Sequence, residues 1–553
     1  MAGFLYFLFS PFIYISDCGV GKINRIQKYF FNGLLVSAGS IILHSISVIF
    51  NIFISNKIGA EAMGLITLVS GVYGFAITLS TSGVNLAVVR LVSSALPYGN
   101  KTQILDTGSD KAVKKIMINA TKYCLFFSFA ASILLFSCAR PIGKFLLDDI
   151  RVIPSIKVMA FSLVPIAISS MLNGYFCAVR RVYKNVIVQF FEQGVKISTI
   201  TFLLLLISPN QIEYASLFIA LGGLVSELAS LGLNLTLYVI DRKKHNSTKN
   251  ESVEIKENRS YSVFSCAFPV AVSAYVRSAL STIEHLAIPW GLKKSGIGAG
   301  KALASYGILH GMVFPLIFFP SSVLGAFSSL LVPEIASSYE AKDFARIKNI
   351  VSYVFGFSLL FSVGVSGIFI SFANEIGAYF FVNDEASEFI RLIAPLIPLM
   401  YLDSAVDAIL KGLGEHIYTM RVNILDSLIS VILIVMLVPS LGIYGYVAVI
   451  FITELLNTSM SIIKLLNKSE VKPKILKWIF KPLLCIIMAT LLCRLIFNSG
   501  AMNTVLSSLM LGKISTILEI GVCALLYIIF SKITGVISSE EISLAKNIVK
   551  KKA

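Results

Sequence analysis

Charged residues are scarce in this chain. Only 14% of the 553 residues are Asp, Glu, Lys or Arg, against about a quarter in soluble globular domains. Hydrophobic residues make up 56% of the chain, and the mean hydropathy is +0.83. This balance excludes a soluble globular protein, because most of the surface of such a chain has to face lipid.

Groups that hold metals or cofactors are also few. The chain has 5 histidines and 8 cysteines, with no CxxC pair and no histidine near a cysteine at metal-ligand spacing. Most of the cysteines lie inside apolar runs, where a thiol acts as a small apolar group. We therefore expect no metal site, no cofactor and no catalytic residue.

Acidic residues are fewer than basic ones: 30 Asp and Glu stand against 47 Lys and Arg, for a formal net charge of +17. Such an excess can indicate nucleic-acid binding. Here, however, the basic residues lie in short loops between apolar runs, where they orient helices toward the cytoplasm. We expect no nucleic-acid partner.

Apolar stretches of about twenty residues, long enough to cross a bilayer, recur almost from end to end. The first six cover residues 29–55, 63–89, 116–138, 158–179, 186–207 and 214–240, and the next six cover 263–290, 303–332, 350–372, 389–410, 422–438 and 444–463. A last pair covers 475–497 and 514–530. The pattern predicts an all-α integral membrane protein with about fourteen transmembrane helices.

A polar stretch at 241–259, DRKKHNSTKNESVEIKENR, separates the first six segments from the rest. An internal repeat supports the division, because Pro165 and Pro398 each follow two apolar residues and precede an acidic residue, Glu192 or Asp426, at nearly the same distance. Two repeated six-helix lobes are typical of transporters. The predicted units are an N-terminal extension (1–28), an N-lobe (29–240), a cytoplasmic linker (241–260), a C-lobe (261–465) and a C-terminal helix pair with a basic tail (466–553).

The basic residues also predict the orientation. With both termini in the cytoplasm, roughly thirty Lys and Arg fall inside and roughly ten outside. One predicted external loop, with Arg140, Lys144, Arg151 and Lys157, departs from this bias, and Asp148 and Asp149 offset it in part. The first twenty residues lack the basic start of a cleavable signal peptide. The expected location is the bacterial plasma membrane.

Polar residues follow one face of several predicted helices, at steps of three and four. The stripes are Ser37, Ser40, His44, Ser47, Asn51 and Ser55 in the first helix; Thr67, Gly71, Gly74, Thr78, Thr81 and Asn85, ending at Arg90, in the second; Ser273, Arg277, Ser281 and Glu284, with His285 beside them, in the seventh; and Tyr306 and His310, before Pro315 and Pro320, in the eighth. Charges inside a membrane usually face water or the bundle interior. We therefore predict a central substrate cavity lined by Arg277, His44, Asn51, Asn85, Arg90, Glu284 and His310.

A structural role is the alternative for each of these residues. Serine and threonine side chains in membrane helices often bond their own backbone or allow close packing. Arg277 can also serve only to pair with Glu284 or His285 and so hold the bundle together.

A second cluster lies in the tenth predicted helix. Asp403, Asp407 and Lys411 are spaced at i, i+4 and i+8, and Asp426 follows in the eleventh helix. Carboxylates on one helix face can hold a coupling cation or carry a proton. Alternatively, Lys411 and Asp407 form a structural pair near the cytoplasmic end.

Several runs resemble the stage V sporulation protein B branch of the polysaccharide exporter and flippase superfamily. They are IGAEAMGL (58–65) with the following VYGFAITLSTSGVNLAVVRLVS, the run FPVAVSAYVRSALSTIEHLAIP before GLKKSG, and YGILHGMVFPLIFFPSSVLGAFSSLLVPEI. The resemblance covers nearly all of the chain after the first twenty-odd residues. It implies two bundles that flank a central cavity, with alternating access to either side of the membrane.

The superfamily includes flippases for lipid-linked peptidoglycan precursors, oligosaccharide exporters and multidrug extrusion antiporters. Relatives often carry arginines in the first helix where this chain has Asn51 and Asn56. The resemblance links basic cavity residues to an anionic diphosphate, a role that Arg90, Arg277, His44 and His310 can fill here.

The leading hypothesis is a flippase for a polyprenyl-diphosphate-linked oligosaccharide or cell-wall precursor, in sporulation or envelope polysaccharide biosynthesis. Two negative charges that leave a cell negative inside gain about 4–5 kcal/mol per 100 mV. Expected partners are the lipid-linked oligosaccharide, membrane lipids and envelope-synthesis enzymes. One alternative is a cation-coupled multidrug antiporter. Another, a membrane-embedded glycan polymerase or ligase, needs a catalytic base, which most of the short external loops cannot house, so we expect no enzyme.

Overall fold

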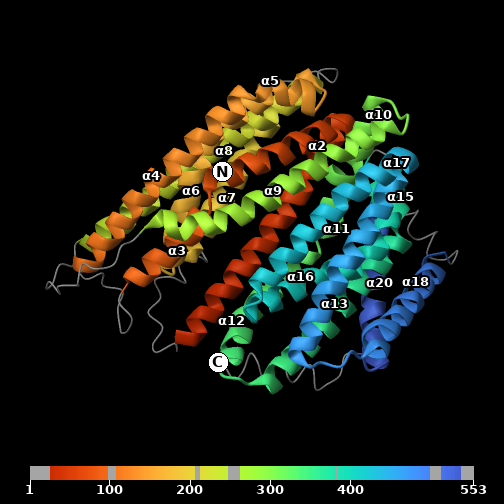
Figure 1. Ribbon diagram of the computed structural model, residues 1–553. Helices are drawn as coiled ribbons and strands as arrows, with labels where there is room; N and C mark the ends of the chain where they lie inside the picture. Colours follow the sequence, from red (N-terminus) through yellow and green to blue (C-terminus); the bar gives the residue numbers. More distant parts are fainter. Residues whose placement is uncertain are drawn as a thin grey trace.

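A computed structural model describes residues 25–96, 107–205, 212–246, 262–381, 384–498 and 512–536, in which all regular secondary structure is helical (Figure 1). The predicted N-terminal extension, except for its last residues, most of the linker and the basic tail lie outside the described residues. Within these described ranges, eleven helical stretches are long and apolar enough to cross a membrane. The predicted all-helical, multi-pass architecture is confirmed.

The helices of the first half are α2 Arg25–Thr81, α3 Val84–Ala95, α4 Thr107–Ser137, α5 Ala139–Pro141, α6 Ile153–Ala178, α7 Val182–Leu205 and α8 Ile212–Asn246. Those of the second half are α9 Val263–Lys294, α10 Ala299–Tyr306, α11 Phe314–Phe318, α12 Ser321–Glu340, α13 Phe344–Ser371, α14 Ala373–Phe380, α15 Glu385–Ile393, α16 Ile397–Gly412, α17 His416–Ser469, α18 Lys481–Asn498 and α20 Gly512–Ile533. Short 3₁₀ or π segments are η1 Ile142–Leu146, η2 Ile150–Val152, η3 Gly307–Val313, η4 Ala394–Leu396 and η5 Leu476–Phe480.

The two longest helices are each divided by a glycine. Helix α2 has 57 residues and α17 has 54, far more than one span needs. At Gly59 (φ 82°) and Gly442 (φ 61°) the backbone leaves the helical region for a conformation that glycine adopts without a steric penalty. Each glycine falls between two predicted segments, so each long helix consists of two parts that are each long enough to cross the membrane.

Two other predicted segments differ from a simple apolar helix. Helix α7 is not among the eleven apolar stretches, since Gln189, Glu192, Gln193 and Lys196 lower its hydropathy. The eighth predicted segment, expected as one bent helix, is instead assembled from α10, the π segment η3, α11 and α12. Pro315 and Pro320 lie at the starts of α11 and α12, where a missing backbone N–H is tolerated.

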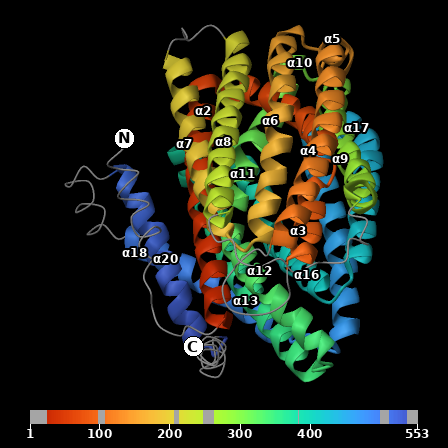
Figure 2. The same cartoon turned by 90° about the vertical axis from the view of Figure 1, so that its left-hand side faces the viewer.

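The helices form two groups (Figures 1 and 2). In the first, α3, α4, α6, α7 and α8 pack on one another; in the second, α12, α13, α16 and α17 do so, while α2 and α9 contact both groups. Helices α18 and α20 form a pair against α13 at the edge of the molecule (Figure 1). We call the end with α5 and α10 the kink end, because Ala60 and Glu61, which directly follow Gly59, lie beside Gly307 and Gly300, and we call the end with α3 and α12 the opposite end (Figure 2). The lobe boundaries remain a prediction.

Glycines allow the second part of α2 to lie against α10 and η3. A Cβ at Gly64 would come within 2.1 Å of the Leu303 carbonyl oxygen, and a Cβ at Gly307 within 2.2 Å of that of Ala60. Such close backbone approach is typical of small residues between membrane helices. Gly64 and Ala60 belong to the IGAEAMGL run at 58–65, so the residues that carry the family resemblance also form this helix contact.

Candidate functional site

The first part of α2 and the α11–α12 region line a half-open cavity of about 310 Å³. Its lining residues are His44, Ser47, Val48, Asn51, Pro315, Phe318, Phe319, Ser321 and Ser322. Helix α2 contributes the polar groups of His44, Ser47 and Asn51, whereas the opposite side contributes the apolar Pro315, Phe318 and Phe319 together with two serines. We call this space the α2–α11 cavity. It contains two of the predicted site residues, His44 and Asn51, and it is suited to a molecule with both polar and apolar parts.

Three other predicted residues lie elsewhere. The Asn85 amide donates to the carbonyl of Ser170 at 3.0 Å, between α3 and α6. Arg90 is exposed on α3, and Arg277 is exposed on α9. The structure therefore does not bring the seven predicted residues into one cavity, and the roles of Asn85, Arg90 and Arg277 remain predictions.

Arg277 does not form the structural pair considered as its alternative. The Glu284 carboxylate accepts a hydrogen bond from Ser430 at 2.7 Å, and the His285 Nδ1 atom lies 3.0 Å from the Tyr306 hydroxyl. Arg277 has no hydrogen bond or ion pair with any of the residues that the structure describes. Its guanidinium is available to a ligand or to water.

Predicted residues of the seventh and eighth helices meet partners on α17. His310 Nε2 lies 2.7 Å from the Tyr446 hydroxyl, and the His285 and His310 rings are 5.1 Å apart between centroids. With Tyr306, these side chains form what we call the His–Tyr network. The sequence indicated Tyr306 and His310, but it gave no signal for Tyr446, which is 136 positions from His310.

The acidic cluster is held by α16 and both parts of α17. Asn457 donates to Asp403 Oδ2 at 3.4 Å, and Lys411 Nζ lies 3.5 Å from Asp407 Oδ2, as the structural alternative predicted. Among the described residues, the buried Oδ1 atoms of Asp403 and Asp426 have no hydrogen-bond partner.

Glu454, which lies near Asp403 and Asp426 and accepts from Thr458 at 3.2 Å, adds a further carboxylate to this cluster. Across the described ranges there is no group of three or more His, Cys, Asp or Glu side chains with the geometry of a metal site.

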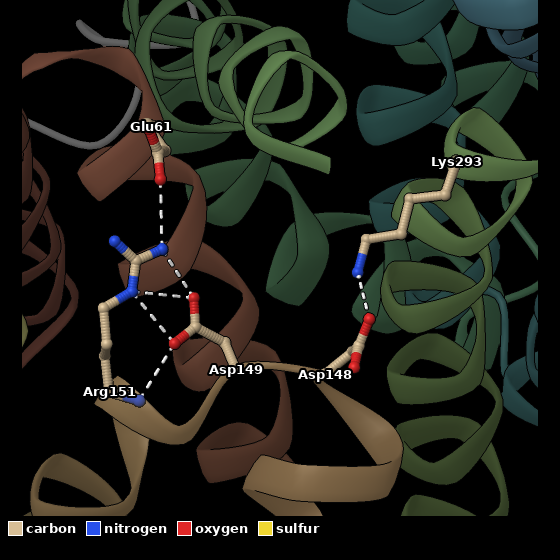
Figure 3. A network of polar contacts seen from close by, with 5 residues as sticks. All are labelled: Glu61, Asp148, Asp149, Arg151 and Lys293. Carbon is tan, nitrogen blue, oxygen red and sulfur yellow. Dashed lines mark hydrogen bonds and ion pairs between the residues drawn. The ribbon is translucent and has the colours of Figure 1, made fainter. Parts of the chain in front are cut away.

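Ion pairs at the kink end connect three segments (Figure 3). Arg151 lies 2.6 Å from Asp149 and 3.0 Å from Glu61 of the IGAE run, and Lys293 at the end of α9 lies 2.9 Å from Asp148. Lys293 holds the pKa of the exposed Asp148 below its usual range. The basic loop that departed from the orientation bias is therefore partly neutralised.

A second contact at this end joins α2 to α14. The Asn56 amide donates to the carbonyl of Phe380, the last residue of α14, at 2.7 Å. Asn56 is one of the two positions at which relatives often carry arginine, and here it serves a contact between helices instead.

Comparison with known proteins gives the family. The polysaccharide biosynthesis protein family matches residues 31–339, and the MatE family matches 295–436. The chain is similar to stage V sporulation protein B of Bacillus subtilis (strain 168), with 25% identity over 456 residues, which cover 80% of this chain and 84% of the relative.

The fold is similar to that of solved transporters. Lipid II flippase MurJ in an inward closed conformation matches with a TM-score of 0.66 at 13% identity, over 91% of this chain and 98% of that one. An inward-facing multidrug resistance MATE family transporter of the MOP superfamily matches with a TM-score of 0.61 at 12% identity, over 78% and 94%. The chain belongs to the polysaccharide biosynthesis protein family, and its predicted resemblance to stage V sporulation protein B is confirmed.

Proposed function

We propose that this protein flips a polyprenyl-diphosphate-linked oligosaccharide or cell-wall precursor across the bacterial plasma membrane by alternating access. The observation that carries the proposal is the α2–α11 cavity, with His44, Ser47 and Asn51 on one side and Phe318 and Phe319 on the other. A lipid-linked sugar has a polar head and an apolar tail, and it needs both kinds of surface along its path. The family and the similarity to a lipid II flippase support the same substrate class.

The kink-end contacts suit a gate that opens and closes. Asp148 is 76% exposed in its pair with Lys293, and an exposed ion pair contributes only about 0–1 kcal/mol. Alternating access requires contacts at one end to break as those at the other form. A weak pair between α9 and the turn after α5 can meet this requirement.

Filling the α2–α11 cavity should prevent substrate binding. In the variant Asn51→Trp the indole takes up much of the space, so the affinity for a polyprenyl-diphosphate-linked disaccharide should fall by about tenfold or more. Binding is measured on purified protein in detergent by the change in fluorescence of a labelled lipid. Ile49→Trp is the matched control, because Ile49 is 67% exposed and does not line the cavity. Equal binding by the two variants would contradict the proposed path.

A cation-coupled multidrug antiporter is the second candidate. The observation that favours it is the acidic cluster, with its unpartnered buried oxygens on Asp403 and Asp426. Buried carboxylate oxygens with free lone pairs attract a cation. An acidic interior also favours a cationic substrate over an anionic lipid.

We also propose the full topology of about fourteen spans, in two six-helix lobes and a final pair, with both termini in the cytoplasm. The observations that support it are the breaks at Gly59 and Gly442, which divide α2 and α17 into two lengths each, and the length of α7. We expect Ser247→Cys, in the predicted cytoplasmic linker, to resist labelling in intact cells, but this position lies outside the described residues.

Cysteine labelling of intact cells tests this orientation. Ser440→Cys, exposed near the Gly442 break, should react with a membrane-impermeant maleimide, whereas Lys342→Cys, exposed between α12 and α13, should react only after permeabilisation. The opposite pattern would reverse the proposed topology. If gels show intact protein but both variants react only after permeabilisation, the Gly442 break does not face outward, which also contradicts the proposed topology.

A further inference from the structure

We propose that Glu284, His285 and His310 form a proton-binding site, and that loading it changes how α9 packs against η3 and α17. The role of this proton in transport rests on the proposed function, whereas the site itself does not. It starts from the His–Tyr network, whose titratable groups come from four separate helical segments, α9, α10, η3 and α17.

The charges in the network favour one proton at a time. The His285 and His310 rings are 5.1 Å apart, so two imidazolium ions would repel each other strongly in an interior of low dielectric constant. Glu284 is next to His285 in the chain, and its carboxylate acts electrostatically on both Tyr306 and Tyr446. A single proton shared by the two imidazoles, with Glu284 ionised, leaves the group neutral.

The proton passes from a hydronium ion to a ring nitrogen, so one O–H bond breaks as one N–H bond forms, and no other covalent bond changes. When it leaves, the Glu284 carboxylate keeps one hydrogen bond, from Ser430 at 2.7 Å. An ionised carboxylate with so few partners is unfavourable in a membrane interior. The unloaded state therefore tends to attract a cation or rearrange.

Loading also reverses hydrogen bonds between helices. A neutral imidazole nitrogen can accept from a tyrosine hydroxyl, but an imidazolium can only donate. Tyr306 therefore has to accept when His285 is charged, and Tyr446 has to accept when His310 is charged. The first bond joins α9 to the end of α10, and the second joins η3 to the second part of α17.

The surrounding backbone contains the features that allow such a shift. His310 lies in a π segment, which often marks a functional site in a helix. Tyr446 follows the backbone break at Gly442 by one turn. By contrast, Gly64 and Gly307 fix η3 tightly to α2. Movement is therefore expected in α9 and α17 rather than in α2.

Other titratable groups on the neighbouring helices are already engaged or more distant. Glu388 of α15 accepts from Tyr444, Arg391 of α15 donates to Asn374, Tyr73 of α2 bonds Ser162, and Glu61 of α2 bonds Arg151. Others on these helices include His44 and Lys57 of α2, Tyr275, Arg277, Lys293 and Lys294 of α9, Lys301 of α10, His416, Arg421, Asp426 and Glu454 of α17, Glu385 of α15 and Lys122 and Tyr123 of α4. Of these, Asp426 interacts electrostatically with Glu284 and joins the site to the acidic cluster.

The site is tested by NMR of protein labelled at the histidine ring carbons, titrated between about pH 5 and pH 9, the range in which histidine ordinarily changes charge. Single His→Asn variants assign the signals. We expect the His285 and His310 signals to move together and account for one proton, and Glu284→Gln to lower the proton affinity by about tenfold. His416→Asn, at an exposed position in α17, should leave both signals unchanged.

Tyr446→Phe serves as the conservative variant, since it keeps the ring and both imidazoles. It should shift the titration midpoint without removing it. Absence of any titration at His285 and His310 in folded, monodisperse protein would overturn the proton site. Two independent titrations, unaffected by Glu284→Gln, would overturn the shared proton.

The packing change has its own reporter. The chain has 2 tryptophans, and Trp290 lies on α9 five positions after His285. In a Trp478→Phe background, Trp290 fluorescence should change with the same pH midpoint as the histidine signals. A titrating site with constant fluorescence would contradict the coupling. Neither measurement needs a lipid substrate, so failure of lipid binding refutes the proposed function while leaving the proton site intact.

Discussion

Replacing Arg277 with alanine is expected to abolish transport and to weaken binding of a diphosphate-linked lipid. The arginine is exposed on α9 and has no partner among the described residues. A hydrogen bond to a charged group contributes about 1.5–3 kcal/mol, so loss of the guanidinium should weaken binding by about 10- to 100-fold. Arg277→Lys keeps the charge but not the two-pronged donation to phosphate oxygens, and should give an intermediate affinity.

Two further variants identify the cause. Glu284→Gln should affect lipid binding less than Arg277→Ala, because Glu284 is bonded to Ser430. Arg140→Ala removes an exposed arginine of a different helix, α5, and should leave affinity unchanged. If Arg277→Ala binds lipid as tightly as the unaltered protein, in material that elutes as a single folded peak, Arg277 does not contact the head group.

The double variant Asp403→Asn, Asp407→Asn is expected to remove any dependence of transport on a sodium gradient while leaving the protein inserted. Neutral amides cannot balance the charge of a bound cation, and Asp403 has a buried oxygen free to bind one. Transport is measured in proteoliposomes with and without an imposed sodium gradient. Glu415→Gln is the control, since Lys468 holds the pKa of that carboxyl below its usual range and ties it to a structural pair.

Unchanged sodium dependence in the double variant would make the cluster structural, as the Lys411–Asp407 pair allows. The response of transport to pH should survive in this variant, because the His–Tyr network lies on other helices. The two ion sites can thus be separated by one set of measurements.

Much of the fold follows from hydropathy. The predicted breaks between segments fall at Gly59 and Gly442, since a chain that crosses twice needs a residue there with an unusual backbone conformation. Hydropathy alone did not indicate the π segment at Gly307–Val313. That segment depends on how Gly64 and Gly307 let η3 approach α2, which is a property of the packed structure.

The site was less predictable for the same reason. Steps of three and four placed His44 and Asn51 on one face, and both line the α2–α11 cavity. Their partners Phe318 and Ser322 lie far along the chain. Lys293 and Asp148, 145 positions apart, likewise carry no signal of their contact. Periodicity identifies the polar face of a helix but not the helix that covers it.

The central claim is that the protein moves a lipid-linked sugar between leaflets. The most direct test uses proteoliposomes that contain a fluorescent polyprenyl-diphosphate-linked disaccharide, with a membrane-impermeant quencher outside and an imposed membrane potential. The account predicts that transfer between leaflets becomes faster with the protein than in protein-free vesicles, rises with a potential that drives anions across, and is lost with Arg277→Ala and Asn51→Trp. Transfer no faster than in protein-free vesicles, together with transport of a cationic dye by the same protein, would contradict it.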